Sequence, residues 1–214
     1  MVRPRVGIVI PALNEVGTIE AVVRQSAKFG TPIVVDDGSC DSTGSVAASI
    51  GAVVIKHECN RGYDASLNSG IRRASELGFD VVITIDADGQ HDPHSIKYCL
   101  ELLDQEVDFV VGVRNKCQRP SEYIFAFITR MRYGLLDPLC GLKGYRISFY
   151  RELGHIDSYG SIGTELVLFG ARNGYAFKQV PLIVRDRNSQ PRFGRGFHAN
   201  YKILRSLIFG LWKY

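Results

Sequence analysis

Short apolar segments alternate with segments of helical periodicity over the first half of the chain, and this alternation restricts the fold more than any other feature. Five segments are apolar at successive positions, as is typical of strands buried on both faces: Val6–Ile10, Ile33–Asp36, Ala52–Lys56, Val81–Ile85 and Phe109–Val113. Four intervening segments carry apolar residues at helical spacing: Gly17–Phe29, Asp41–Ile50, Asp64–Leu77 and Pro93–Gln105. We therefore predict an α/β fold with a mostly parallel central sheet and helices on both of its faces.

The second half of the chain is less regular. Its pattern predicts strands at Gly141–Tyr150 and Ala176–Val184 and helices at Ile162–Ala171 and Ala199–Trp212. No internal repeat or linker interrupts the chain, so we expect the 214 residues to form a single domain.

The composition argues against several classes of protein. A hydrophobic content of 45% with 22% charged residues is that of a globular and not of a disordered chain. The net charge of +4 suits a phosphate-bearing ligand or an anionic membrane, but no basic segment interleaved with aromatic residues resembles a nucleic-acid reader, so we expect no nucleic-acid partner. The five cysteines include no CxxC pair, which argues against zinc or a disulfide framework and favours a reducing compartment.

The sequence shows neither a signal peptide nor an apolar stretch of the roughly 18–20 residues that a spanning helix needs. We therefore expect a cytoplasmic protein whose contact with the inner face of the membrane, if it has one, is peripheral.

Polar and acidic residues follow three of the predicted strands. The first strand is followed by Pro11–Glu15, the second ends in Asp36-Asp37-Gly38-Ser39, and the fourth runs into Asp86-Ala87-Asp88-Gly89-Gln90. Ligands of parallel α/β sheets bind outside the carboxyl ends of the strands, so these segments are the first candidates for a binding site.

The acids after the fourth strand suit a metal ion. Asp86 and Asp88, two residues apart at a strand end, can converge on a divalent cation, and Mg²⁺ and Mn²⁺ prefer such oxygen ligands. Gln90 offers a neutral oxygen two residues further on. The alternative for this segment is a solvated Asx-rich turn.

Asp36 and Asp37 form a second acidic pair. A carboxylate here can accept a hydrogen bond from a nucleobase N–H, as uracil and guanine offer, and the alternative is a helix N-cap around Ser39–Ser42. The sequence contains no GxGxxG, GxxxxGK[ST] or GxSxG motif, which argues against a dinucleotide fold, a P-loop and a serine hydrolase.

Four motifs in this order resemble the family 2 glycosyltransferases of the GT-A fold: Ile8–Glu15, Val35–Ser39, Asn60-Arg61-Gly62 and Asp86–Pro93. The stretch DADGQHDP is most similar to the dolichol-phosphate and polyprenol-phosphate mannosyltransferase branch. The resemblance implies an inverting, metal-dependent transfer of a sugar from GDP-mannose or a UDP-hexose to a polyprenyl-phosphate or lipid-linked glycan acceptor. Residues 1–115 would bind the nucleotide sugar and residues 116–214 the acceptor.

The resemblance also implies roles for individual residues. Those expected to bind the donor lie in the first, second and fourth motifs: Pro11, Ala12, Asn14, Glu15, Asp37, Asp86 and Ala87. Among them, Asp37 would contact the edge of the base and Asp86 the ribose or the sugar. The metal, Mg²⁺ or Mn²⁺, would be held by Asp88 and Gln90.

The second half resembles the same branch more loosely. Asp137–Arg146 is similar to its "D…GFR" segment, Glu165 falls where a helix glutamate is usual, and Val180–Ile183 followed by Arg187 is similar to its "EVPI…R" segment. A lysine of the branch is missing from the loop that follows, so its role would fall to one of two arginines: Arg192 or Arg195. These departures leave the exact donor and acceptor open.

Three residues are predicted to take part in catalysis. Arg114 falls where the branch has an arginine near the donor, and it would neutralise charge on the departing nucleoside diphosphate; the alternative is an arginine that caps a strand end. A hydroxyl acceptor would need a general base, for which Asp137 is the first candidate and Glu165 the second, whereas a phosphate acceptor would need none. The alternative for Asp137 is a plain Asp-Pro turn.

Two segments are candidates for membrane contact. Arg119–Leu136 combines basic with aromatic residues, and Lys202–Lys213 carries apolar residues between its charges. The alternative, which we favour for Arg119–Leu136, is a helix packed on the sheet.

Other functions remain as alternatives. They are a glycosyltransferase with a soluble hydroxyl acceptor and a nucleotide-sugar-binding subunit without catalysis. A nucleotidyltransferase is disfavoured because Pro11–Glu15 occupies the place of its glycine-rich first loop, and a receiver domain because its acidic pair follows the first strand.

Overall fold

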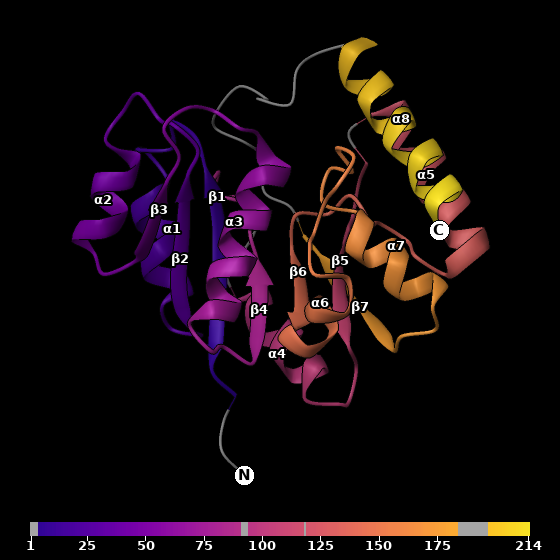
Figure 1. Cartoon of the computed structure of the whole chain (residues 1–214), viewed down its shortest axis with the longest axis horizontal. Helices are drawn as coiled ribbons and strands as arrows, with labels where there is room; N and C mark the ends of the chain where they lie inside the picture. The colour runs from indigo at the N-terminus through magenta and orange to yellow at the C-terminus, as the bar shows by residue number, and fades with distance from the viewer. Residues whose placement is uncertain (1–3, 91–93, 118, 184–196) are drawn as a thin grey trace.

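The computed structural model describes residues 4–90, 94–117, 119–183 and 197–214. Its strands form one sheet in the order β3-β2-β1-β4-β6-β5-β7 (Figure 1). The strands are β1 (Val6–Ala12), β2 (Thr31–Asp36), β3 (Val53–Lys56), β4 (Val81–Thr84), β5 (Phe109–Arg114), β6 (Lys143–Arg146) and β7 (Phe177–Leu182). Among these strands β6 runs antiparallel to its neighbours β4 and β5, and the other pairs are parallel, so the predicted mostly parallel sheet is confirmed.

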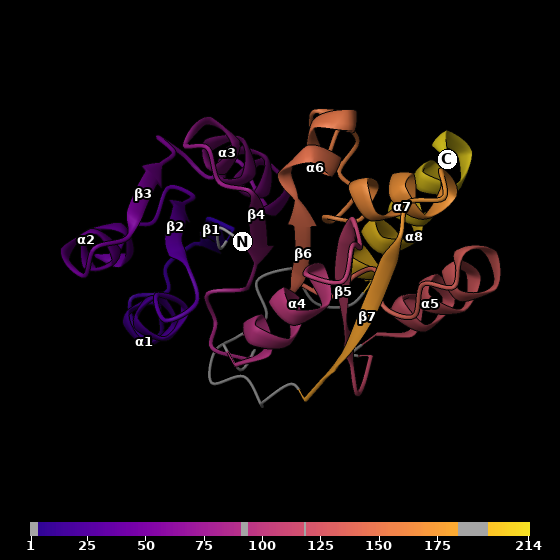
Figure 2. The same ribbon diagram turned by 90° about the horizontal axis from the view of Figure 1, so that it is seen from below.

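Helices cover both faces of the sheet, as predicted (Figure 2). One face carries α1 (Ile19–Ser26), α2 (Thr43–Ser49) and α4 (Ser95–Leu103), and the other carries α3 (Tyr63–Glu76), α6 (Ile147–Leu153) and α7 (Glu165–Arg172). The remaining helices, α5 (Pro120–Tyr133) and α8 (Phe197–Lys213), lie side by side at the end of the molecule opposite α2 (Figure 1).

Successive residues of the central strands point into two separate cores. Ile8 and Ile10 of β1 pack with α1, α2 and α4, whereas Val9 between them packs with α3 on the other face. The same alternation separates Val110 from Val111 in β5, and all five side chains are fully buried. This double burial explains why the central strands carry apolar residues at successive positions, and each fully buried large apolar side chain contributes about 1.5–3 kcal/mol to folding.

One predicted strand is partly wrong. Strand β6 spans only Lys143–Arg146, and Ile147–Tyr150 of the predicted strand Gly141–Tyr150 belong to helix α6. Arg146 is the last residue of β6 before α6 begins. Its guanidinium donates hydrogen bonds to the carbonyls of Val107 and of Leu103 at the end of α4. Since the residues of α6 that face the core are as apolar as those of a buried strand, the sequence pattern did not separate the two.

Helices α5 and α8 each bury one side and expose the other. Phe125, Ile203 and Leu207 belong to the core shared with α3 and α7, so packing on the molecule accounts for one side of each helix. Their exposed large apolar residues are Tyr123, Ile124, Phe127, Met131, Phe197, Tyr201, Ile208, Phe209 and Trp212. In the parts of the chain that the structure describes, no helix combines the length and the apolar character needed to cross a bilayer.

Candidate active site

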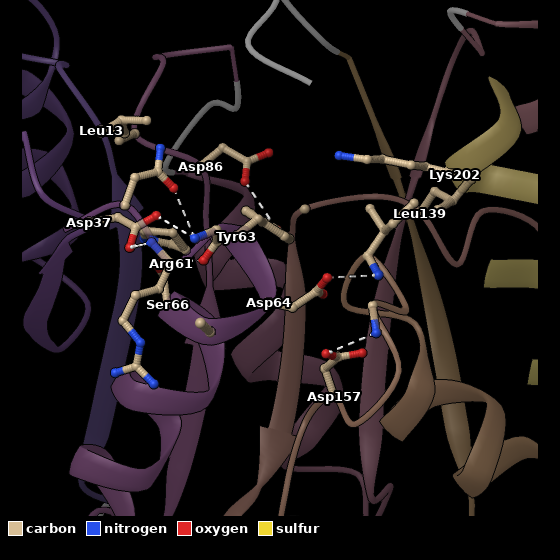
Figure 3. Close-up of a pocket in the computed structure, with 18 of the residues that line it drawn as sticks. Leu13, Asp37, Arg61, Tyr63, Asp64, Ser66, Asp86, Leu139, Asp157 and Lys202 are labelled. Atoms are coloured by element: carbon tan, nitrogen blue, oxygen red, sulfur yellow. Dashed lines mark hydrogen bonds between the residues drawn. The ribbon is translucent and has the colours of Figure 1, made fainter. Parts of the chain in front are cut away.

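A cavity of about 900 Å³ opens at the carboxyl edge of β1, β2 and β4 (Figure 3). The three strand-end segments singled out in the sequence meet here. The predicted site residues that line the cavity are Pro11, Ala12, Glu15, Asp37, Asp86, Ala87, Asp88 and Arg114. The described residues Asn14, Gln90, Asp137 and Glu165 are not among those that line it, and Arg187, Arg192 and Arg195 lie outside the described residues.

The segment after β1 is tied to the segment after β2. Asn14 has a φ of +50°, which asparagine tolerates better than most residues. Its backbone N–H donates to the Ser39 hydroxyl at 2.9 Å, and its side-chain oxygen accepts the Cys40 N–H at 2.8 Å. The N–H of the buried Glu15 donates to the Thr43 hydroxyl at 2.8 Å. Asn14 therefore positions the edge of the cavity without lining it.

Asp37, which follows β2, accepts hydrogen bonds from three donors. The Arg61 N–H reaches Oδ1 at 2.9 Å, the Gly62 N–H reaches Oδ2 at 2.8 Å, and Nδ1 of His57 lies 2.6 Å from Oδ1. Gly62 is the N-cap of α3 and has a φ of +92°, a conformation that favours glycine. Asn60 shares the Gly62 N–H at 3.0 Å. The motif Asn60-Arg61-Gly62, to which the sequence analysis assigned no role, thus presents two backbone donors to Asp37.

Asp86 comes shortly after β4 and is held from two sides. The Tyr63 hydroxyl donates to its Oδ1 at 3.3 Å, and burial together with the nearby charge of Asp86 raises the pKa of Tyr63 well above its usual value, so Tyr63 stays protonated. On the other side the carboxylate packs against Gly141, where a Cβ would lie 2.6 Å from the Asp86 Cγ. Lys202 of α8 extends across the cavity toward Asp86 (Figure 3).

Asp88 is the second carboxylate of this segment, and its Oδ1 accepts the backbone N–H of Gln90 at 3.0 Å. Within the described ranges no group of three or more His, Cys, Asp or Glu side chains could hold a metal ion. Mg²⁺ and Mn²⁺ are commonly bound by one or two carboxylates plus substrate phosphates. The pair Asp86 and Asp88, which both line the cavity, fits a cation of this kind whose other ligands come from a substrate.

Arg114 at the end of β5 is fixed by Asp137. Its Nε and Nη2 donate to the two carboxylate oxygens of Asp137 at 2.7 and 2.8 Å, and its Nη2 also lies 3.2 Å from Glu122. Burial lowers the pKa of Arg114, but the hydrogen bond and the charge of Asp137 outweigh it and raise the pKa above its usual value. Both oxygens of Asp137 are therefore committed to the guanidinium of Arg114, which is a poor arrangement for a general base.

Glu165 begins α7 and lies away from the cavity lining. Its fully buried carboxylate accepts hydrogen bonds from the Ser158 N–H at 2.6 Å and the Tyr214 hydroxyl at 2.9 Å, and it pairs with Lys213 at 2.5 Å. Burial alone would raise the pKa of Glu165, but the hydrogen bonds from Lys213, Ser158, His155 and Tyr214 lower it. Glu165 thus links the end of α8 to the loop before α7.

The opposite wall of the cavity contains residues that the sequence analysis did not identify. Asp64 in the first turn of α3 accepts the N–H groups of Ile162 and Gly163 at 3.2 and 2.6 Å, and Asp157 accepts the Ser161 N–H at 2.6 Å. Burial and the charge of Asp157 raise the pKa of Asp64 to about 6. Neither acid follows a strand, so the strand-end criterion could not find them.

Basic side chains from α8 and from Arg119, the N-cap residue of α5, complete this wall. The cavity-lining residues of this group are Arg119, His198, Lys202 and Arg205. Arg119 pairs with Glu122 at 3.1 Å, and Arg205 donates to the Tyr159 carbonyl at 2.7 Å. The sequence predicted a helix here, at Ala199–Trp212, but gave no sign that its polar side faces the cavity.

Residues 7–153 match the sequence model described as glycosyl transferase family 2. The chain belongs to this family, and the protein is therefore a glycosyltransferase. The resemblance of its motifs to the polyprenol-phosphate branch is supported by two curated relatives. Polyprenol monophosphomannose synthase of Mycolicibacterium smegmatis is 28% identical over 217 residues, which cover 87% of this chain and 80% of that protein. Undecaprenyl-phosphate mannosyltransferase of Micrococcus luteus is 27% identical over 206 residues, covering 86% of this chain and 84% of that protein.

A solved structure confirms the predicted GT-A fold. Glucosyl-3-phosphoglycerate synthase from Mycobacterium tuberculosis, crystallised with Mn²⁺, UDP and glucosyl-3-phosphoglycerate, superposes with a TM-score of 0.77. The superposition covers 97% of this chain and 80% of that chain at 22% sequence identity. At this identity the likeness defines the fold and not the substrate.

Proposed function

We propose that this glycosyltransferase moves a sugar, with inversion and with the aid of Mg²⁺ or Mn²⁺, from a nucleoside diphosphate sugar to a polyprenyl phosphate or lipid-linked glycan. The proposal rests on one cavity that combines strand-end carboxylates with basic side chains. Carboxylates at the strand ends form the first wall, and the second wall holds the basic side chains of Arg119 and α8 beside Asp64 and Asp157. The volume of about 900 Å³ suits a substrate of this size, since ligand cavities measure about 300–1,000 Å³.

The donor would lie along the strand ends. Pro11, Ala12 and Glu15 would contact the base and ribose, Asp37 the edge of the base, and Asp86 the ribose or sugar. Asp88, with Gln90 as predicted from the resemblance, would hold the cation beside Asp86. When bound, such a cation neutralises the charge that develops on the leaving diphosphate.

The chain's own residues would serve the same step. Arg114 lines the cavity with its guanidinium held in place by Asp137, so it can stabilise negative charge without reorganising. Inversion by direct displacement requires no enzyme nucleophile.

The hydrogen bonds and ion pairs of the candidate carboxylates favour a sugar acceptor that needs no general base. Asp137 and Glu165, the two candidates for that role, are bound to cations and do not line the cavity. Asp64 and Asp157 do line it, but each accepts backbone N–H groups of the loop at residues 157–163. A phosphate acceptor is already anionic, and the basic side chains that line the second wall of the cavity can bind it. The names of the two relatives, polyprenol monophosphomannose synthase and undecaprenyl-phosphate mannosyltransferase, also support a lipid phosphate acceptor.

Substitution of Asp88 tests the proposed donor site. Asp88→Ala is expected to lower the rate of sugar transfer from UDP- or GDP-sugars to a short polyprenyl phosphate, in MnCl₂, by about 100-fold or more, because the diphosphate loses its cation. Asp104→Ala removes an exposed acid at the end of α4, away from the cavity, and should keep full activity. Equal turnover of the two variants would refute the metal role of Asp88, and transfer to soluble sugars but not to the lipid phosphate would refute the acceptor.

We also propose that α5 and α8 rest on the membrane surface that carries such an acceptor. Their exposed apolar side chains are accompanied by arginines and lysines, and the single acid of the two helices, Glu122, is buried in ion pairs with Arg114 and Arg119. Apolar and basic residues without exposed acids suit an anionic lipid surface.

Vesicle binding tests this surface. The double variant Phe127→Ser, Trp212→Ser should bind vesicles of phosphatidylglycerol and phosphatidylcholine at least about tenfold more weakly than the original chain, because two large side chains no longer enter the lipid. Tyr98→Ser on α4, which removes an exposed aromatic residue from another surface, should bind as before. Unchanged binding by the double variant would show that these helices do not meet the membrane.

A further inference from the structure

His57 contacts Asp37 and has no part in the function proposed so far. It follows β3, is 5% exposed, and its ring joins two elements. Nδ1 lies 2.6 Å from Oδ1 of Asp37, and Nε2 lies 3.0 Å from the Ser69 hydroxyl of α3. A carboxylate only accepts hydrogen bonds, so Nδ1 carries the hydrogen and donates it to Asp37.

The donors around Asp37 leave little of its carboxylate free. Each oxygen of a carboxylate has two lone pairs, which gives about four acceptor positions in total. Oδ1 accepts both the His57 Nδ1–H and the Arg61 N–H, while Oδ2 accepts the Gly62 N–H. Among the described residues, these donors leave one acceptor position of Asp37, on Oδ2. Because Asp37 lines the cavity, this position is available to a ligand there.

The carboxylate is also held rigidly. The Asp37 N–H donates to the Ala12 carbonyl at 2.9 Å, and the His57 N–H donates to the Asp36 carbonyl at 2.9 Å. Both backbones are thus fixed to neighbouring strands, and Asp37 cannot turn to expose Oδ1 without breaking the buried contact with His57. A ligand must therefore bind to the Asp37 carboxylate in this fixed orientation.

We infer that His57 restricts Asp37 to one N–H group of the base, so that the donor is a uridine and not a guanosine nucleotide. This inference rests on the proposed binding of a nucleoside diphosphate sugar with its base at Asp37. Uracil presents a single N–H between two carbonyl groups, which one free position on Oδ2 can accept. Guanine presents two adjacent N–H groups that pair with both oxygens of a carboxylate, and here Oδ1 is already occupied. Adenine and cytosine turn a ring nitrogen lone pair toward the carboxylate.

A guanine bound here would leave one N–H without an acceptor. An unsatisfied donor of this kind lowers affinity by about tenfold or more. The specificity arises because the His57 Nδ1–H occupies an acceptor position of Oδ1 that guanine would need. His57 therefore acts through Asp37 as a positioning residue and does not contact the substrate.

Nucleotide binding by His57 variants tests the inference. Calorimetry with UDP, GDP, CDP and ADP, each with MnCl₂, should show that the unchanged protein binds UDP at least about tenfold more tightly than GDP. His57→Phe keeps a ring in the buried space but removes the donor, so the preference for UDP over GDP should fall about tenfold, mainly through tighter binding of GDP. His57→Asn places an amide nitrogen near the position of Nδ1 and should restore the preference.

The outcomes separate this inference from the proposed function. If the unchanged protein binds none of the four nucleotides, the proposed function itself fails. If it binds GDP as tightly as UDP, or if His57→Phe keeps the original ratio, the role assigned to His57 is wrong while nucleotide binding stands. A purely structural role would weaken UDP and GDP alike and leave their ratio unchanged. Should the phenylalanine variant not fold, His57→Gln, whose amide reaches toward Ser69 and not Asp37, is expected to show the same loss of preference.

Discussion

Replacing Gly141 with alanine displaces the Asp86 carboxylate without altering Asp86 itself. A Cβ at position 141 would lie 2.6 Å from the Asp86 Cγ, whereas ordinary van der Waals contact begins near 3.4 Å, so the carboxyl group must withdraw by about 1 Å. The backbone of Gly141 is held by the Thr84 hydroxyl, which donates to its carbonyl at 2.7 Å. The side chain of Asp86 is therefore the part that moves. Gly141 does not have a positive φ, so alanine can adopt the same backbone.

A displacement of about 1 Å in a reacting site costs about 100-fold in rate. We expect Gly141→Ala to lower kcat/KM for sugar transfer by about that factor and to lower the melting temperature by only a few degrees, since a flexible side chain absorbs the strain. Metal-dependent release of the nucleoside diphosphate, followed by a coupled enzyme assay, measures the first quantity, and thermal unfolding measures the second.

Gly17→Ala is the matched control for this experiment. A Cβ at Gly17 meets no atom within 4 Å, and Gly17 also has no positive φ, so this variant should keep full activity. If Gly141→Ala retains kcat/KM within about twofold of Gly17→Ala, the position of Asp86 does not govern the reaction. A loss of activity that merely follows a large loss of stability would refute the geometric reasoning as well.

Two further predictions concern buried charges. Because burial raises the pKa of Asp64 from its usual 3.8 to about 6, ionising this group costs the folded protein stability as the pH rises from about 4 to above 6. Asp64→Asn removes that cost, so its free energy of unfolding in urea, relative to that of the original chain, should rise by at most about 3 kcal/mol between pH 4 and 7.5; a difference independent of pH would contradict this. Asp137→Ala leaves the buried Arg114 without its bidentate partner and should lower the free energy of unfolding by about 3–5 kcal/mol. Glu101→Ala, which breaks an exposed pair with Lys97 at 3.7 Å, should lower it by less than about 1 kcal/mol, and equal losses in the two variants would refute the difference.

The sequence predicted the first half of the fold well because strands buried on both faces carry recognisable runs of apolar residues. Strands β1, β2, β4 and β5 carry runs of apolar residues at successive positions, and the polar residues Asp37 and Asp86 stand out shortly after two of these runs. Topology then brings these strand ends to one edge, so the strand-end side of the cavity could be located from sequence alone.

The second half was harder to predict because its cavity residues depend on contacts distant in sequence. Position in a motif suggested that Asp137 and Glu165 face a substrate, but it could not show that Arg114 and Lys213 occupy their oxygens. Lys202 lies on a helix whose amphipathic pattern reports only which side is buried. His57 drew no attention, since a lone histidine after a strand has no sequence signature and acquires its partner through the pairing of β3 with β2.

The direction of strand β6 bears on how this protein could be recombined with its relatives. Because β6 runs against β4 and β5, it begins at the edge where they end, and the segment leading into it places Gly141 against Asp86 and Asp137 against Arg114. A chimera that exchanges the portion after residue 115 would therefore import a foreign support for Asp86 and Arg114. A junction after α6, near residue 153 where the family match also stops, would keep these supports with the residues that they hold.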